Sequence, residues 1–398
     1  MNDPIVLAYS GGLDTSFCIP YLKEKYATDV HAVIVDCVGL KRSEKEAIRQ
    51  RALDLGAAEF ACFDGFPSLY DHILSFLIKG NVLRDRTYPL CVGAERYIQA
   101  ELILEYAKEQ GTNRIAHGST GAGNDQVRFD VALRTAMPDV EIIAPIRDEE
   151  LTREDTTAFL KEKGFDVPQK TTNYSINDGI WGTSVGGTET ITSEKALPFE
   201  AFPNLKAPHE LDDEPEELTI DFAHGLPVAV NGHQMEASAL LEALREFGRY
   251  HGIGMGMHLG DTILGIKGRI GFEAPVAKIL YTAHRELEKL VLSQEQRQIK
   301  DSLADKYGAM LHEANYYDPV MRDIEAFFNS TQARVTGEVT LYACRGSLFP
   351  LKAHSPYSAM NNSIAKYGEE AGGWNGSEAR AYSKLYSIRT QIYNTRSK

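Results

Sequence analysis

Short apolar runs alternate with longer amphipathic stretches through the first 165 residues. This pattern predicts strands at residues 5–8, 30–36, 59–63, 114–116 and 141–144. The gaps between them predict helices at residues 15–26, 43–55 and 95–109. Strands that alternate with helices imply a parallel sheet covered on both faces. In such sheets, ligands bind beyond the carboxyl ends of the strands, where the strand order reverses.

A different pattern begins after residue 165. Residues 166–215 have few helix signals and several prolines and glycines, so loops and isolated strands are expected there. Paired strands are predicted at residues 219–222 and 228–231, and helices at residues 238–250 and from residue 276 to about residue 314. We therefore expect an α/β nucleotide-binding domain with a five-stranded parallel sheet (1–165), an α+β synthetase and multimerisation domain (166–360) and a C-terminal tail (361–398).

The C-terminal tail contains a predicted helix at residues 377–395. An apolar and aromatic stripe at helical spacing runs along it, and its basic residues are nearly unopposed by acidic ones. In a chain with a net charge of -14, such a helix favours docking on an acidic surface, for which another copy of the chain is a candidate. The sequence thus predicts a role in oligomerisation.

Composition narrows the class of protein. The chain has 398 residues, of which 43% are hydrophobic and 25% are charged, which is typical of a soluble enzyme with two domains. Its net negative charge argues against a broad nucleic-acid surface. No apolar run reaches membrane-spanning length, and the first residues do not resemble a signal peptide, so we expect a cytoplasmic protein with no membrane partner. The five cysteines form no CxxC pair, which favours buried thiols over disulfides or zinc.

The strongest chemical signal follows the first predicted strand. It is the run Ala8, Tyr9, Ser10, Gly11, Gly12, Leu13, Asp14, Thr15 and Ser16. A glycine pair at a helix N-terminus lets backbone N–H groups approach an anion, and the flanking hydroxyls can bind phosphate oxygens. Asp14 can hold Mg²⁺ or orient the loop. A merely tight turn would explain the glycines but not the flanking polar residues, and the lack of a lysine excludes a Walker A loop.

A second glycine-rich loop, residues 117–123, follows the fourth predicted strand. Asn124, Asp125 and Arg128 come directly after it and supply an amide, a carboxylate and a guanidinium. If the strand order is 3-2-1-4-5, the first and fourth strands are neighbours, and both loops border one crevice.

The first loop resembles the SGGxDS/T loop of the PP-loop ATP pyrophosphatases, whose fold is that of the adenine nucleotide alpha hydrolases. The segment HGSTGAGNDQVRF, which begins at His117, is very similar to HGCTGKGNDQVRF of the argininosuccinate synthases. The resemblance continues through residues 143–147, 174–177, 181–184, 228–232 and 251–254. Two long motifs in the same order identify the chain as a member of this family.

The resemblance implies a reaction. ATP with Mg²⁺ adenylates the ureido oxygen of citrulline with release of pyrophosphate, and aspartate then displaces AMP to give argininosuccinate. It also implies a homotetramer.

The resemblance assigns roles by position in the motifs. It places ATP on the first loop and Gly118. It places aspartate on Thr120, Asn124 and Asp125. Citrulline contacts are implied at Tyr88, Asn124, Arg128, Ser175 and Ser184. Asp14, Asp125 and Arg128 are the candidate catalytic residues, with Asp14 or Asp125 near the metal. Taken alone, Ser175 and Ser184 could be turn residues and Tyr88 a packing residue.

Departures from the family pattern gather on the citrulline side. Val92 and Gly93 stand where the family has a Thr-Ser pair, Gly260 where it has Glu, and Phe272 where it has Tyr; Ala122 replaces a Lys. An unpaired polar group in a closed site is costly, so other groups must replace those lost. We expect Asp261 or a water molecule to cover the lost carboxylate. The alternatives are a family member with a modified or different ureido acceptor and a non-catalytic nucleotide-binding protein.

Overall fold

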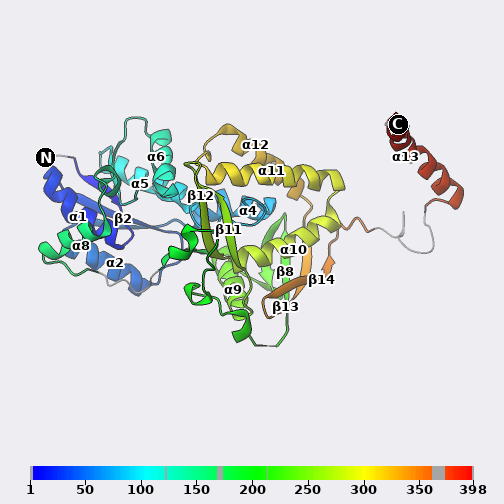
Figure 1. The fold of residues 1–398 in the computed structure, drawn as a ribbon, viewed down its shortest axis with the longest axis horizontal. Coiled ribbons are helices and arrows are strands. Elements are labelled where there is room, and N and C mark those ends of the chain that lie inside the picture. The colour runs from blue at the N-terminus through cyan, green and yellow to red at the C-terminus, as the bar shows by residue number, and fades with distance from the viewer. Residues whose placement is uncertain (1–2, 122, 168–173, 213, 361–372, 397–398) are drawn as a thin grey trace.

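The computed structural model describes residues 3–121, 123–167, 174–212, 214–360 and 373–396. Ala122 and most of the segment that joins the predicted C-terminal helix to the rest lie outside the described residues. Figure 1 shows the N-terminal sheet at one end of the molecule, a second body beside it and the C-terminal helix beyond.

The N-terminal body is built on a five-stranded parallel sheet, which confirms the predicted fold class. Its strands are β1 (Ile5–Ala8), β2 (Val30–Asp36), β3 (Glu59–Asp64), β4 (Arg114–His117) and β5 (Glu141–Ile143). Their order is β3-β2-β1-β4-β5, the order that brings both glycine-rich loops to one edge. In the register, Leu7 of β1 lies between Ala32 of β2 and Ala116 of β4.

Helices cover both faces of this sheet because successive strand residues point to opposite sides. Ile5 and Leu7 pack with α1 (Leu13–Tyr26), α2 (Arg42–Asp54) and α8 (Arg153–Glu162). Val6, between them, packs on the other face with α5 (Glu95–Glu109) and α6 (Asn124–Ala136). A single-turn helix, α7 (Pro145–Asp148), follows β5.

The second body contains two antiparallel sheets. One has the order β10-β9-β8-β13-β14, with β8 (Glu216–Ala223), β9 (Leu226–Val230), β10 (His233–Gln234), β13 (Gly337–Cys344) and β14 (Ser347–His354). The other has the order β11-β12-β7-β6, with β6 (Ser175–Asp178), β7 (Thr183–Gly186), β11 (Met255–Asp261) and β12 (Lys267–Glu273). Single turns of 3-10 helix at Thr188–Ile191, Phe199–Ala201 and Pro208–Glu210 join them.

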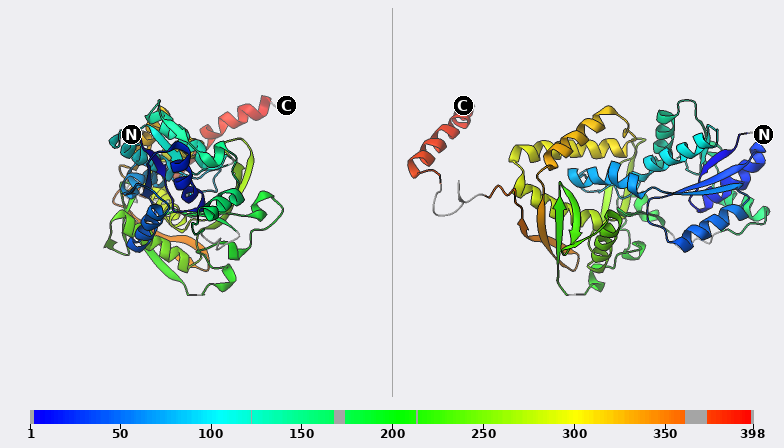
Figure 2. Two further views of the ribbon diagram at one scale, coloured as in Figure 1. Left: turned by 90° about the vertical axis from the view of Figure 1, so that its left-hand side faces the viewer. Right: turned by 180° about the vertical axis from the view of Figure 1, so that it is seen from behind.

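Helices complete the second body (Figure 2). They are α9 (Ala237–Tyr250), α10 (Pro275–Val291), α11 (Gln294–His312) and α12 (Pro319–Gln332). The predicted helical region from residue 276 is divided because the Ser293 side chain accepts a hydrogen bond from Gln296 N and so begins a new helix.

One segment of the N-terminal half packs into the second body. It runs through α3 (Phe66–Leu69), a π-helical turn (Tyr70–Leu74) and α4 (Ser75–Gly80). Tyr281 donates to Val82 O (2.8 Å), and Lys300 donates to Gly80 O (2.9 Å). This segment ties the two bodies together, and it leads directly into the residues that approach the site.

The C-terminal helix, α13 (Gly376–Arg396), lies apart from the rest of the molecule in Figures 1 and 2, and none of its residues is buried. Within the described residues, no helix has the length and apolar character required to cross a bilayer.

Candidate active site

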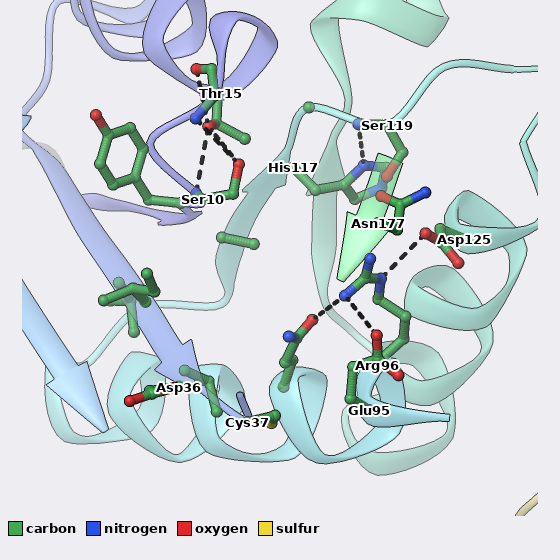
Figure 3. Close-up of a pocket in the computed structure, with 18 of the residues that line it drawn as sticks. Ser10, Thr15, Asp36, Cys37, Glu95, Arg96, His117, Ser119, Asp125 and Asn177 are labelled. Atoms are coloured by element: carbon green, nitrogen blue, oxygen red, sulfur yellow. Dashed lines mark hydrogen bonds and ion pairs between the residues drawn. The ribbon is translucent and has the colours of Figure 1, made fainter. Parts of the chain in front are cut away.

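A cavity of about 510 Å³ lies at the carboxyl edge of the parallel sheet. Its walls come from the loops after β1 and β4, the end of β2, the start of α5, α6 and the edge strand β6 of the second body. Figure 3 shows side chains from these elements around one space. The two glycine-rich loops therefore border one crevice, as predicted from the strand order.

Hydroxyl groups hold the first loop in shape. Ser10 N donates to Thr15 Oγ1 (3.3 Å), and Gly12 N donates to Ser10 Oγ (3.3 Å). Gly11 has a φ of +77°, which favours glycine. Since α1 begins at Leu13, its first N–H groups and the positive end of its dipole lie at the cavity. The loop is thus a preformed anion site.

Two flanking residues of this loop differ in placement. Asp14 lines the cavity, and burial raises the pKa of its carboxyl group although the charge of Arg153 opposes that shift. Ser16 is fully buried, and its hydroxyl accepts from Arg51 Nε (2.9 Å). Asp14 can therefore reach a ligand, whereas the Ser16 hydroxyl braces the loop from behind.

The second glycine-rich loop rests directly on the first. A Cβ atom at Gly118 would lie 3.0 Å from Thr15 Cγ2 and 3.2 Å from Thr15 N, so glycine permits this close approach. His117, which ends β4, accepts from Ser119 N through Nδ1 (3.3 Å). Since Nδ1 acts as an acceptor, Nε2 carries the proton of the neutral ring.

A ring of side chains braces the second loop from below. His117 Nε2 donates to Asp130 Oδ1 (3.0 Å), and Arg147 Nη1 donates to Asp130 Oδ2 (2.9 Å). The same Arg147 atom donates to Gln126 Oε1 (3.0 Å), and Gln126 Nε2 donates to Gly121 O (3.3 Å). The loop is therefore fixed at both ends by one hydrogen-bonded network.

Asp125 lies between two guanidinium groups. Arg96 Nε donates to Oδ2 (3.1 Å), and Arg128 Nη1 donates to Oδ1 (2.9 Å). Burial raises the pKa of Asp125, but the two arginines outweigh it and hold the pKa below its ordinary value. Figure 3 shows Arg96 between Asp125 and Glu95 on the cavity wall. Asp125 is thus a charged carboxylate with both oxygens already paired.

Arg128 lies behind Asp125 and is 5% exposed. Its Nη2 donates to His312 O (3.0 Å) and to His312 Nδ1 (3.2 Å). Burial and the charges of Arg128, Arg84 and His258 lower the pKa of His312 to about 3, so this ring is neutral and accepts from Arg128. Arg128 accordingly joins α6 to the end of α11.

Neighbouring groups fill the space at the positions that depart from the family pattern. A Cβ at Gly93 (φ +100°) would lie 2.4 Å from Arg128 Nη1, and one at Gly260 would lie 2.5 Å from His258 Nε2. The Phe272 ring packs on Gly256, so that a Cβ there would lie 2.3 Å from Phe272 Cζ. A guanidinium, an imidazole and a backbone thus occupy these places. Val92 is partly buried against the main hydrophobic core.

The predicted site residues divide into those that line the cavity and those that do not. The lining includes Ala8, Tyr9, Ser10, Gly12, Leu13, Asp14, Thr15, Gly118 and Asp125. Outside it lie Gly11, Ser16, Thr120, Asn124, Tyr88, Arg128, Ser175 and Ser184. The structure therefore brings most of the predicted ATP residues together, whereas the predicted citrulline residues, and Thr120 and Asn124 of the predicted aspartate site, lie outside the cavity lining.

Three of those candidates have distinct surroundings. The Ser184 hydroxyl is buried and has no hydrogen-bond partner among the described residues. An unpaired buried hydroxyl is costly, which favours a ligand contact over a turn. Tyr88 is buried and stacks on His258 (ring centroids 5.3 Å apart). Asn124 Oδ1 accepts from Ile263 N (3.0 Å), which docks the β11–β12 hairpin on the start of α6.

Several residues line the cavity although the sequence did not predict them as site residues. They are Asp36, Cys37, Glu95, Arg96, Gln99, Ile176, Asn177 and Asp178. Asp36 ends a predicted strand and Cys37 follows it, so the rule that ligands bind at the carboxyl ends of strands would have found both. Glu95 and Arg96 open α5, and no glycine or hydroxyl pattern marks them. Asn177 lies on β6 of the second body, and spacing along the sequence cannot show that this strand lines the cavity.

The donor set suits a metal ion only as a companion of phosphate. The described residues contain no group of three or more His, Cys, Asp or Glu side chains able to hold a metal ion. Mg²⁺ commonly binds through one or two carboxylates, water and substrate phosphates. Asp14, beside the first loop, fits such a role.

Known proteins resemble this chain over nearly its whole length. A family model described as the arginosuccinate synthase N-terminal HUP domain matches residues 4–166, and one described as the arginosuccinate synthase C-terminal domain matches residues 174–393. A curated protein named argininosuccinate synthase from Xanthomonas campestris pv. campestris is 39% identical over 395 residues, 98% of each chain. One of the same name from Methanocaldococcus jannaschii is 35% identical, over 99% of this chain and 98% of its own.

Proposed function

The chain belongs to the argininosuccinate synthase family, and we propose that its cavity joins citrulline to aspartate at the expense of ATP. The products are argininosuccinate, AMP and pyrophosphate, which makes the protein a carbon–nitrogen ligase of arginine biosynthesis. The observation that carries the proposal is the convergence of two glycine-rich loops and the Arg96–Asp125 pair on one cavity. A purely nucleotide-binding role would not require these charged side chains beside the phosphate loop.

The first loop grips the leaving group in this reaction. Backbone N–H groups at the start of α1 and the Ser10 and Thr15 hydroxyls line the cavity and suit the β- and γ-phosphates of ATP. Donors that are fixed before the reaction stabilise charge as it develops on the departing pyrophosphate. The ureido oxygen of citrulline forms a bond to the α-phosphorus while the bond to pyrophosphate breaks.

The second glycine-rich loop is proposed to align aspartate with the adenylate in the second step. The amino group of aspartate attacks the adenylated carbon, and AMP leaves with the former ureido oxygen. Gly118, Thr120 and Asn124 are proposed to hold the nucleotide and aspartate. Asp125 is proposed to take part in the aspartate site through its negative charge, which Arg96 and Arg128 hold in place. Tyr88, Ser175 and Ser184 are proposed citrulline contacts. Holding three substrates in line supplies much of the rate enhancement.

Arg128 and Asp125 receive narrower roles than the sequence suggested. Arg128 has bonds to His312 and Asp125 and stands outside the cavity lining, so we propose that it positions Asp125. Arg96 is then the guanidinium that faces the substrates. Since both Asp125 oxygens are paired with arginines, Asp14 is the better neighbour for Mg²⁺, which would neutralise phosphate charge when bound.

Location and assembly are further proposals that rest on the family resemblance. We propose a cytoplasmic homotetramer that acts on small molecules, with neither nucleic acid nor membrane as a partner.

Pyrophosphate release tests the proposed reaction. The purified protein is mixed with ATP and Mg²⁺, and then with citrulline alone, with aspartate alone or with both. We expect repeated turnover, with argininosuccinate as product, only when both amino acids are present; citrulline alone should release at most one pyrophosphate per site. Continued turnover without aspartate, or no release with citrulline under any condition, would refute the proposal. Turnover with another ureido compound alone would instead indicate a changed acceptor.

A further inference from the structure

Glu95 is a carboxylate with unused binding capacity on the cavity wall. It is the first residue of α5, and its side chain is 12% exposed. Its Oε2 accepts from Gly93 N (2.8 Å). Its Oε1 makes no hydrogen bond within the described part of the chain; it forms an ion pair with Arg96 Nη1 at 3.5 Å, beyond ordinary hydrogen-bond length. One oxygen therefore remains available to a donor in the cavity.

The cavity lining has more negative than positive side chains, which favours a ligand that carries a positively charged group. Its lining contains five carboxylates, those of Asp14, Asp36, Glu95, Asp125 and Asp178, and one guanidinium, that of Arg96. Three of the other acids have a side-chain donor closer than the 3.5 Å that separates Glu95 Oε1 from Arg96 Nη1. Asp36 binds Lys45 and backbone N–H groups, Asp125 binds two arginines, and Asp178 accepts from the Thr183 hydroxyl. Asp14 belongs to the phosphate loop, which leaves Glu95 at the opposite end.

Asp261 was expected to replace the carboxylate that is missing at Gly260, but it does not line the cavity. Asp261 pairs with Lys267 (2.7 Å) on the exposed β11–β12 hairpin and is outside the cavity lining. The space beside Gly260 is filled by His258. Glu95 adjoins Gly93, another of the altered positions, and faces the cavity from there.

We propose that Glu95 binds the α-ammonium group of the acceptor amino acid, an inference that rests on the proposed function. A carboxylate fixed on one oxygen by a backbone N–H is held in one orientation, so its second oxygen is presented to the ligand at little entropic cost. A charge-assisted hydrogen bond in this half-enclosed place favours an α-amino acid over a ureido acid that lacks the amino group.

Substituting both the protein and the substrate tests this role. The change is Glu95→Gln, whose amide oxygen can still accept from Gly93 N. The substrates are citrulline and 5-ureidopentanoate, which is citrulline without its α-amino group. We expect the variant to raise the KM for citrulline about 10- to 100-fold, because it loses a charged partner. The KM values for ATP and aspartate should stay within about twofold, and kcat/KM for 5-ureidopentanoate should not fall.

Two further variants sharpen the result. Glu105→Gln, on the exposed side of the same helix, should leave every constant unchanged. Asp261→Asn tests the competing acid. An unchanged citrulline KM in the Glu95 variant, or a raised one in the Asp261 variant, would overturn the proposal.

Calorimetric binding of citrulline separates this inference from the proposed function. A wild-type protein that produces no argininosuccinate would refute the function itself. Equal citrulline affinity of the wild-type and Glu95→Gln proteins would refute the role of Glu95, whatever the turnover.

Discussion

Asp36, at the end of β2, lines the cavity, and its carboxylate holds the backbone of the loop that follows β2. Its Oδ1 accepts from Val38 N (3.0 Å) and Gly39 N (2.8 Å), and its Oδ2 accepts from Leu40 N (3.0 Å) and lies 2.7 Å from Lys45 Nζ. Burial raises the pKa of this group, but the bonds from Lys45 and the backbone outweigh it and hold the pKa below its ordinary value. The loop after β2 therefore depends on a charged Asp36.

Replacing Asp36 by Asn should lower the free energy of unfolding by about 1–3 kcal/mol at pH 7, because an amide offers one acceptor oxygen instead of two. A lowered folded-state pKa gives stability that is present above the unfolded value, near 4, and is lost as the pH falls through the folded value. The difference between the two proteins should therefore shrink below about pH 4. Thermal unfolding between pH 7 and pH 3 measures it.

Asp64 provides the matched control for this change. It ends the neighbouring strand β3, but it is exposed and accepts from a single backbone N–H, that of Phe66 (3.1 Å). Asp64→Asn should lower the free energy of unfolding much less than Asp36→Asn does. Equal losses at the two positions would show that the bonds to the β2 loop carry no special weight.

At the scale of elements, the second loop owes its shape to a network that spans β4, α6 and α7. The network joins His117, Asp130, Arg147 and Gln126 and ends on Gly121 O. Burial raises the pKa of Asp130, yet the bonds from His117 and Arg147 keep it below its ordinary value. The carboxylate is therefore the charged centre of the brace.

Asp130→Asn should weaken the brace and raise the KM for ATP about tenfold, with a smaller fall in kcat. An amide cannot accept from His117 and Arg147 with both of its polar atoms, so one bond to a charged or ring N–H group is lost. Steady-state kinetics with each substrate varied in turn measures the effect. Asp148→Asn is the control, because Asp148 touches Arg147 from outside the ring (2.8 Å). A KM for ATP that rises equally in both variants would contradict a specific role for the ring.

The sequence predicted elements well wherever one local pattern determines them. The strands of the parallel sheet have apolar residues on both faces, so their runs are continuous, and β1 and β2 match the predicted bounds. The sheet formed by β6, β7 and the β11–β12 hairpin was not predicted because its strands are short or polar and because β7 pairs with β12 across a long sequence separation. The same contrast holds in the site. Glycine and hydroxyl patterns marked both loops, whereas Glu95 and Asn177 reach the cavity only through tertiary packing.

At the scale of the whole molecule, α13 presents an apolar face that stays exposed within the part of the chain that the structure describes. Tyr382, Leu385, Tyr386, Ile392 and Tyr393 lie on one side of the helix, and Leu385 and Tyr386 are 67% and 73% exposed. A contiguous stripe of this kind marks an interaction surface. Arg389 lies within this stripe, and Arg380 and Lys384 lie on the opposite side of the helix. The net charge of -14 makes another copy of this chain an acidic partner for them.

Removing α13 should therefore reduce the size of the assembly. A chain that ends at residue 375 retains the described residues of both bodies, so it should fold but form smaller oligomers in light scattering coupled to gel filtration. Leu385→Ser with Ile392→Ser should have the same effect through loss of apolar contact area, since full burial of each side chain contributes about 1.5–3 kcal/mol. Gln391→Ala, on the opposite face of the helix, should leave the assembly intact. If all three proteins elute as the wild type does, the helix is not the element that joins the subunits, and the sheets of the second body become the place to seek that contact.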